Sequence, residues 1–150
     1  MITTYHEEVA DDAGHGGLVT IAQYFKGLAD QTRLRMLNLL FQGELCGCDI
    51  QHVLDVSQSN VSRHLNYLKR AGLVLDRRGG YRVFYRLADA HDPNRTPLFD
   101  YLRAVFRRDA MFAADLKELK SAIRDGACTR SERPAGRVGR SAPPDRRATL

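Results

Sequence analysis

The chain has 150 residues, of which 43% are hydrophobic, and this is enough for one domain with a single core. No apolar run approaches the roughly 20 residues that a transmembrane helix needs, and residues 1–17 lack the apolar stretch of a signal peptide, so we expect a cytoplasmic protein with no membrane partner. Three cysteines are too few for a disulfide scaffold, so we expect thiols or metal ligands.

Positive charge is concentrated in one part of the chain. The net charge is +5, from 23 basic and 18 acidic residues. Residues 58–87 alone contain seven Lys or Arg side chains against a single acid, Asp76, which gives this segment a net charge of +6. A folded domain with its excess positive charge in one segment is expected to bind a polyanion there.

The two ends of the chain differ in composition from the part between them. Residues 1–17 are polar and acidic, and we expect a flexible segment. Residues 127–150 are rich in Arg, Pro, Gly and Ser, and we expect a disordered tail. The ordered domain is therefore predicted to span residues 18–126.

Apolar residues recur at helical spacing through the first half of this domain. The spacing predicts four helices, over residues 18–28, between Asp30 and Gly43, over 48–54 and over 58–70. Asp30 and Ser57 are predicted N-caps, because their short side chains accept hydrogen bonds from the first free backbone N–H groups of a helix. Tyr24 and Phe25 are expected to be core aromatic residues.

The apolar period changes after Gly72. Residues 73–77 and 81–87 are β-prone runs separated by Arg78-Gly79-Gly80, which predicts a hairpin. Two further helices are predicted over 97–108 and 110–124. The chain is therefore predicted to be mainly α with a β-hairpin wing, a winged helix-turn-helix in which residues 48–54 and 58–70 form the helix-turn-helix.

The helix over residues 58–70 separates apolar from polar side chains. At about 100° per residue, Val61, Leu65 and Leu68 share one face, and the opposite face carries no aliphatic side chain. A solvated helix face has the same pattern, but a basic hairpin next to it favours DNA binding. The predicted DNA-contacting residues are Gln58, Ser59, Asn60, Ser62, Arg63, His64, Asn66, Arg70, Arg77, Arg78 and Arg82.

Four sequence blocks resemble the ArsR/SmtB family of metal-responsive winged-helix repressors, and the similarity spans about residues 20–125. The blocks are Ala29–Leu34, Glu44–Asp49, Ser57–Leu65 and Ala71–Val74. The resemblance implies a homodimeric repressor that binds double-stranded operator DNA at an inverted repeat and leaves it when an inducer binds. It also implies that the first and last helices of the domain form the dimer interface.

Cys46 and Cys48 flank Gly47 at the start of the predicted helix 48–54. A helix N-terminus favours thiolates, and Gly47 would permit a non-helical turn that aims both sulfur atoms at one ion. Thiolates are soft ligands that suit thiophilic ions. The resemblance implies a sensor of As(III) or Sb(III) in one branch of the family, and of cadmium, lead or zinc in another.

The block Glu44–Asp49, which contains Cys46 and Cys48, differs from the family pattern because it lacks a third cysteine that could bind the ion. Gln51 stands where the arsenite-responsive box has a further cysteine, and residues 1–17 contain none. The family's other sensor site needs Asp and His pairs near the C-terminus, and no His follows His91. Cys128 is the remaining cysteine and therefore the candidate third metal ligand.

Three functions stay open. The first is an arsenite or antimonite sensor, and the second is a sensor of soft divalent metals or of thiol oxidation, including persulfide. We expect Cys46 and Cys48 to be too close in sequence for a relaxed disulfide, so an oxidative switch would use Cys128. The third is a protein-interaction module. An enzyme is not expected, because no nucleophile–base pair or carboxylate pair occurs at motif-like spacing.

Overall fold

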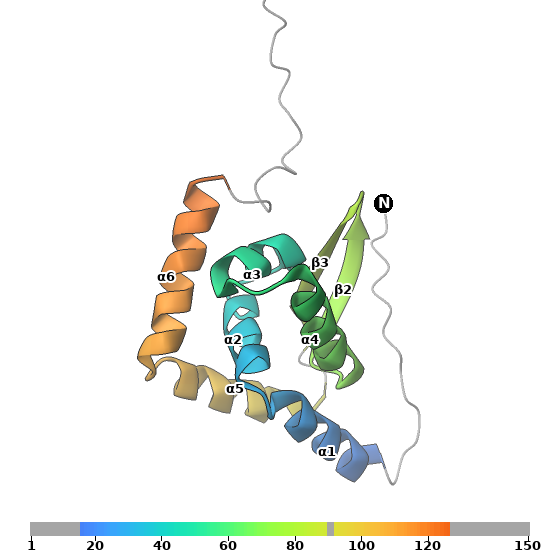
Figure 1. Ribbon diagram of the computed structural model, residues 1–150. Coiled ribbons are helices and arrows are strands. Elements are labelled where there is room, and N and C mark those ends of the chain that lie inside the picture. Colours follow the sequence, from blue (N-terminus) through green and yellow to red (C-terminus); the bar gives the residue numbers. More distant parts are fainter. Residues whose placement is uncertain (1–15, 90–91, 127–150) are drawn as a thin grey trace, which may run out of the picture.

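The computed structural model describes residues 16–89 and 92–126 (Figure 1). The elements are α1 (Gly16–Leu28), α2 (Gln31–Leu40), β1 (Leu45–Cys46), α3 (Gly47–Leu54), α4 (Gln58–Arg70), β2 (Val74–Gly79), β3 (Arg82–Leu87), α5 (Arg95–Phe106) and α6 (Ala110–Arg124). This is the predicted winged helix-turn-helix. The proposed tail, with Cys128, and nearly all of the proposed N-terminal segment lie outside the described residues.

The wing is part of a three-stranded sheet with the strand order β1-β3-β2. β2 and β3 pair antiparallel from Val74↔Leu87 to Gly79↔Arg82. Arg78 and Gly79 therefore extend β2, whereas they were expected in the turn, and Gly80 forms the turn with a φ of 62° that favours glycine. The sequence also missed β1, because two residues are too few to show a strand period.

Both predicted N-caps are confirmed. The Asp30 carboxylate accepts a hydrogen bond from the Arg33 N–H at 2.9 Å, and the Ser57 hydroxyl accepts one from the Asn60 N–H at 3.3 Å. These caps fix the first turns of α2 and α4 and so the boundaries of the helix-turn-helix.

The core lies where α2, α3 and α4 meet the sheet. Val61, Leu65 and Leu68 are buried as predicted, so α4 packs on the core through its apolar face. Tyr24 is also buried, but Phe25 is 62% exposed, and its expected place in the core is wrong. The two residues differ because consecutive positions on α1 point about 100° apart.

The last helix, α6, packs along α2 and α3, at the left of Figure 1. Arg35 of α2 donates two hydrogen bonds to the Asp115 carboxylate, at 2.8 and 2.7 Å, and Leu119 is buried. Phe112 and Leu116 of the α6 stripe are partly buried against the core, whereas Ile123 is exposed, so this helix contributes to its own chain and still keeps apolar surface. Among residues 16–89 and 92–126, no helix combines the length and apolar character that crossing a membrane requires.

Candidate DNA-binding surface and cysteine site

The outer face of α4 is polar and carries no acidic side chain. The exposed members of the predicted set on this helix are Gln58, Ser59, Asn60, Ser62, Arg63, Asn66 and Arg70. Arg63 donates a hydrogen bond to the Asn60 side chain at 3.1 Å. Ser62 shares a hydrogen bond with the Tyr85 hydroxyl, which joins α4 to the wing. Amide, hydroxyl and guanidinium groups on one exposed helix face suit contacts to base edges and phosphates.

His64 is the member of the predicted set on α4 that faces inward. Its side chain is only 13% exposed, and Nδ1 lies 3.7 Å from the Asp30 carboxylate. Burial lowers the pKa of His64, and the Asp30 charge opposes this effect. The geometry therefore gives His64 a place in the packing between α2 and α4.

The wing arginines differ in what they contact. Arg77 donates a hydrogen bond to Glu44 at 2.9 Å and lies 4.3 Å from the centre of the Phe84 ring. Arg78 is exposed, and Arg82 lies 5.6 Å from the centre of the Tyr81 ring. Arg77 is therefore held against the domain, whereas Arg78 is directed outward near the tip of the wing.

Tyr81 was missed by the sequence-based search for site residues. It forms the turn of the wing together with Gly80, and its side chain is 92% exposed. A large aromatic side chain at a two-residue turn has no core to pack on, and this is the signal that singles it out.

Cys46 and Cys48 are joined by a disulfide, with their Cα atoms 5.3 Å apart. The expectation that two cysteines so close in sequence would not pair is wrong. Cys46 is the N-cap of α3, with φ −77° and ψ 155°, so it lies outside the helix in an extended conformation. That places the Cα atoms within the usual range for a disulfide. Gly47 is the first helical residue, so the non-helical turn expected at Gly47 is at Cys46 instead.

Asp49 adds a carboxylate to the two cysteines. It is 1% exposed, and its Oδ2 atom accepts a hydrogen bond from the Cys46 N–H at 3.3 Å. One ligand atom from each of Cys46, Cys48 and Asp49 lies within 4.8 Å of the others. Asp49 belongs to the block Glu44–Asp49, but the sequence did not predict it as a metal ligand. The direction of its carboxylate depends on the backbone conformation of the N-cap residue Cys46.

The helix that begins at the cysteine site, α3, packs on both predicted DNA-binding elements, α4 and the wing strand β3. Cys46 of β1 pairs with Phe84 of β3, which is part of the wing. A methyl group placed on Gly47 would come within 3.6 Å of Tyr85 Cε2 and 4.0 Å of Val61 Cγ1 of α4. A change at the two cysteines is thus one contact away from both the wing and α4.

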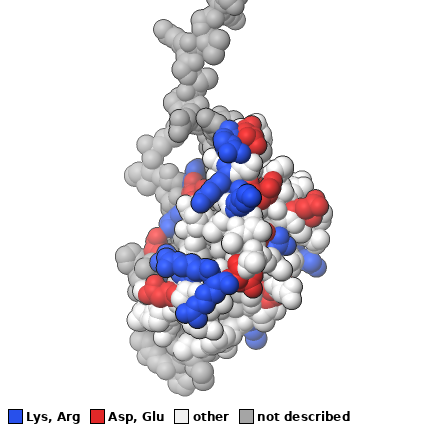
Figure 2. All heavy atoms as spheres, turned by 90° about the vertical axis from the view of Figure 1, so that its left-hand side faces the viewer, with Lys and Arg blue, Asp and Glu red and all other residues white. Residues whose placement is uncertain are grey.

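The face of the molecule that carries α6 differs from that of α4. Figure 2 shows acidic side chains among the basic ones there. Interspersed charges of both signs give a weaker attraction for a polyanion than a predominantly basic surface does, and on α4 and the strands of the wing Asp76 is the single acid. The charge distribution therefore favours α4 and the wing as the surface for nucleic acid.

Residues 30–75 match the family described as "Bacterial regulatory protein, arsR family". The chain is 53% identical over 64 residues to the arsenic resistance transcriptional regulator ArsR1 of Pseudomonas putida, which covers 42% of this chain and 50% of that protein. It is 34% identical over 95 residues to a cadmium resistance regulatory protein CadC homolog of Staphylococcus aureus, covering 60% and 78%. The chain spans about half the length of the first of these relatives.

Solved structures with the same fold include a homodimeric winged helix-turn-helix domain from Mycobacterium bovis. The TM-score is 0.53 at 32% identity, covering 65% of this chain and 89% of that one. HlyU from Vibrio cholerae gives a TM-score of 0.54 at 28% identity, covering 61% and 97%. The likeness extends over most of the described part of the chain.

Proposed function

Because the chain belongs to the arsR family of bacterial regulatory proteins, which are transcriptional regulators and not enzymes, we propose that it is a repressor released from DNA by a thiophilic ion. The observation that carries this proposal is the cluster of Cys46, Cys48 and Asp49 at the start of α3, because α3 packs on both α4 and the wing strand β3. The ion binds the two thiolates, and α4 with the wing binds an operator.

The DNA contacts divide into two kinds. Arg63, Ser59 and Asn66 on α4 read base edges in a major groove, and Arg78 and Arg82 of the wing contact the backbone. Arg77 and His64 are proposed to support these elements from within, because each has a partner in the domain. The operator is an inverted repeat whose half-site centres lie about one helical turn apart.

The dimer interface is proposed to lie on α1 and α5. Phe25 and Tyr101 are exposed aromatic residues on these helices, beside a groove of about 560 Å³ that both helices line. Large exposed apolar groups on adjacent helices are typical of a surface that a second subunit covers. The homodimeric relative supports a dimer, without indicating which helices form its interface.

Ion binding requires that the Cys46–Cys48 disulfide be reduced. A dithiol reductant supplies two electrons and two protons, which break the S–S bond and leave two thiols, while the reductant becomes a disulfide. Deprotonated thiols then supply two soft donors. The third donor is Cys128 for As(III) or Sb(III), which prefer sulfur.

A soft divalent metal is the second candidate inducer, and Asp49 is the observation that favours it. A carboxylate oxygen beside two sulfur atoms suits Cd²⁺, Pb²⁺ or Zn²⁺ better than a trivalent metalloid. Oxidation itself, including persulfide formation, is the third candidate, since the two cysteines form a disulfide. The names of the relatives include both arsenic and cadmium resistance.

DNA binding is tested first with Arg63→Ala, using Lys117→Ala on α6 as the matched loss of one positive charge. We expect Arg63→Ala to weaken operator binding by ~1–3 kcal/mol and to relax specificity, because Arg63 reads a base edge. Lys117→Ala should leave affinity within twofold. Fluorescence anisotropy at several salt concentrations measures both. A chain that binds no duplex DNA even at low salt would instead support the protein-interaction module.

The inducer is identified by operator release in parallel titrations. The reduced protein on its operator is titrated with arsenite, antimonite, Cd²⁺, Pb²⁺, Zn²⁺ and a persulfide donor. We expect release by arsenite and antimonite at the lowest concentration. Release by the divalent ions alone would instead identify a soft divalent metal as the inducer, with Asp49 as its third ligand.

A further inference from the structure

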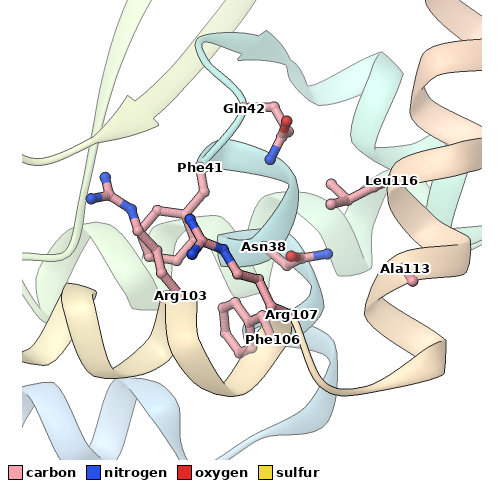
Figure 3. Close-up of a pocket in the computed structure, with 8 residues that line it drawn as sticks. All are labelled: Asn38, Phe41, Gln42, Arg103, Phe106, Arg107, Ala113 and Leu116. Atoms are coloured by element: carbon pink, nitrogen blue, oxygen red, sulfur yellow. The ribbon is translucent and has the colours of Figure 1, made fainter.

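A hollow of about 350 Å³ lies between α2, α5 and α6, away from the cysteine site. Figure 3 shows the side chains that line it. Its apolar wall is made by Phe41, Phe106, Ala113 and Leu116, and the Phe41 and Phe106 ring centres are 5.9 Å apart. This volume falls at the lower end of the range for small-molecule sites, which are about 300–1,000 Å³.

Two guanidinium groups border the same hollow, and no acidic side chain lines it. Arg103 is on α5 and Arg107 is the C-cap of this helix, one turn further along, and both lie on the side of Phe41 (Figure 3). Arg103 lies 4.9 Å from the centre of the Phe41 ring. No carboxylate of residues 16–89 or 92–126 comes within ion-pair distance of Arg107. Arg103 also lies 3.7 Å from the Asp100 carboxylate, so the positive charge at the rim comes chiefly from Arg107.

Asn38 adds a polar atom deep in the wall. Its side chain is 3% exposed, and its Nδ2 group donates to the Phe112 carbonyl at 3.1 Å. Its Oδ1 atom accepts no hydrogen bond from the described part of the chain. This oxygen is not fully enclosed by the protein, so a donor placed in the hollow can reach it.

We propose that this hollow binds a small organic anion with an apolar ring. The ring would contact Phe41 and Phe106, a carboxylate would pair with Arg107 and Arg103, and a hydroxyl would donate to Asn38 Oδ1. Inorganic anions do not use the apolar wall, and a neutral ring does not use the arginines. The hollow would be a second effector site, separate from the cysteines. It is linked to them through α6, which also packs on α3.

The test uses the full chain without DNA, so its outcome does not depend on the repressor proposal. The probe is 4-hydroxybenzoate, compared with neutral 4-hydroxybenzamide and with inorganic phosphate, by calorimetry and by thermal shift. We expect the carboxylate to bind about tenfold or more tightly than either, because charge-assisted hydrogen bonds to arginine are lost in the amide.

Variants locate the site. Arg107→Ala should weaken 4-hydroxybenzoate binding about tenfold, and Arg108→Ala, an exposed neighbour outside the hollow, should not change it. Leu116→Phe should abolish binding by filling the hollow while both arginines remain. Equal binding of the acid and the amide, equal effects of Arg107→Ala and Arg108→Ala, or unchanged binding in a folded Leu116→Phe variant would each overturn the proposal.

Discussion

His64 shows how one side chain can belong to a DNA-binding helix and still serve the fold. His64 is on α4 and faces Asp30, and burial lowers its pKa below the value of about 6.5 that it has in the unfolded chain. The unfolded state therefore binds more protons as the pH falls through this value. The free energy of unfolding contributed by neutral His64 is fully present at pH values above the pKa of His64 in the unfolded chain. It is lost as the pH falls below that value.

We predict that the wild type loses stability between about pH 7.5 and about pH 5.5, and that His64→Gln loses less over this range. Urea unfolding at each pH measures the difference. His52→Gln, which removes a well-exposed histidine, is the control and should behave like the wild type. A pH dependence identical in His64→Gln and the wild type would show that His64 does not carry this effect.

At the scale of single residues, the spacing of apolar side chains predicted the two faces of α4, because side-chain directions in a helix repeat every ~3.6 residues. The inward direction of His64 was not predictable, because it depends on Asp30 of another helix. The partner of Arg77, Glu44, lies 33 residues earlier in the chain. The disulfide depended on the extended conformation of Cys46, which no apolar pattern encodes.

At the scale of elements, the wing places two neighbouring arginines in different roles. Arg77 joins β2 to Glu44, just before β1, whereas Arg78 faces solvent. We predict that Arg77→Ala lowers the free energy of unfolding by ~1 kcal/mol, since this ion pair is partly screened. Arg78→Ala should leave unfolding unchanged, weaken binding to all DNA sequences alike and reduce the salt slope by about one unit.

Chemical unfolding and salt-dependent DNA titrations of the two variants make this comparison. The assignment fails if Arg78→Ala is the destabilised variant and Arg77→Ala folds like the wild type.

The helices α2 and α4 and their N-caps were predictable from sequence, because the capping side chains of Asp30 and Ser57 act on backbone groups close by in the chain. The strand β1 was not, because only its pairing with β3 defines it.

At the scale of the whole molecule, the helices that keep exposed apolar side chains are the candidates for contact with a second subunit. The family resemblance implied the first and last helices, and on α6 Leu119 is buried against the core whereas Met111 and Ile123 are exposed. Two of the exposed aromatic residues, Phe25 and Tyr101, lie on α1 and α5. Sequence alone could not make this distinction, because an apolar stripe looks the same whether its own chain or a partner covers it.

We predict that Phe25→Glu converts a dimer to a folded monomer that binds its operator weakly, because the charge would be buried at the interface. Met111→Glu on α6 is the matched control, since Met111 is also an exposed apolar residue. Sedimentation velocity measures the oligomeric state. A dimer that survives Phe25→Glu but is lost in Met111→Glu would return the interface to α6.

The central claim is that Cys46 and Cys48 hold the inducer and transmit its binding to α4 and the wing. Release of a labelled operator by arsenite, measured on reduced wild type, Cys46→Ser, Cys48→Ser and Cys128→Ser, tests it most directly. Reduced wild type should lose affinity ~100-fold, a coupling of about 2.7 kcal/mol. Cys46→Ser and Cys48→Ser should bind DNA and not release it, and loss of release in Cys128→Ser would identify the third donor. If Cys46→Ser and Cys48→Ser both still release the operator, the claim is wrong.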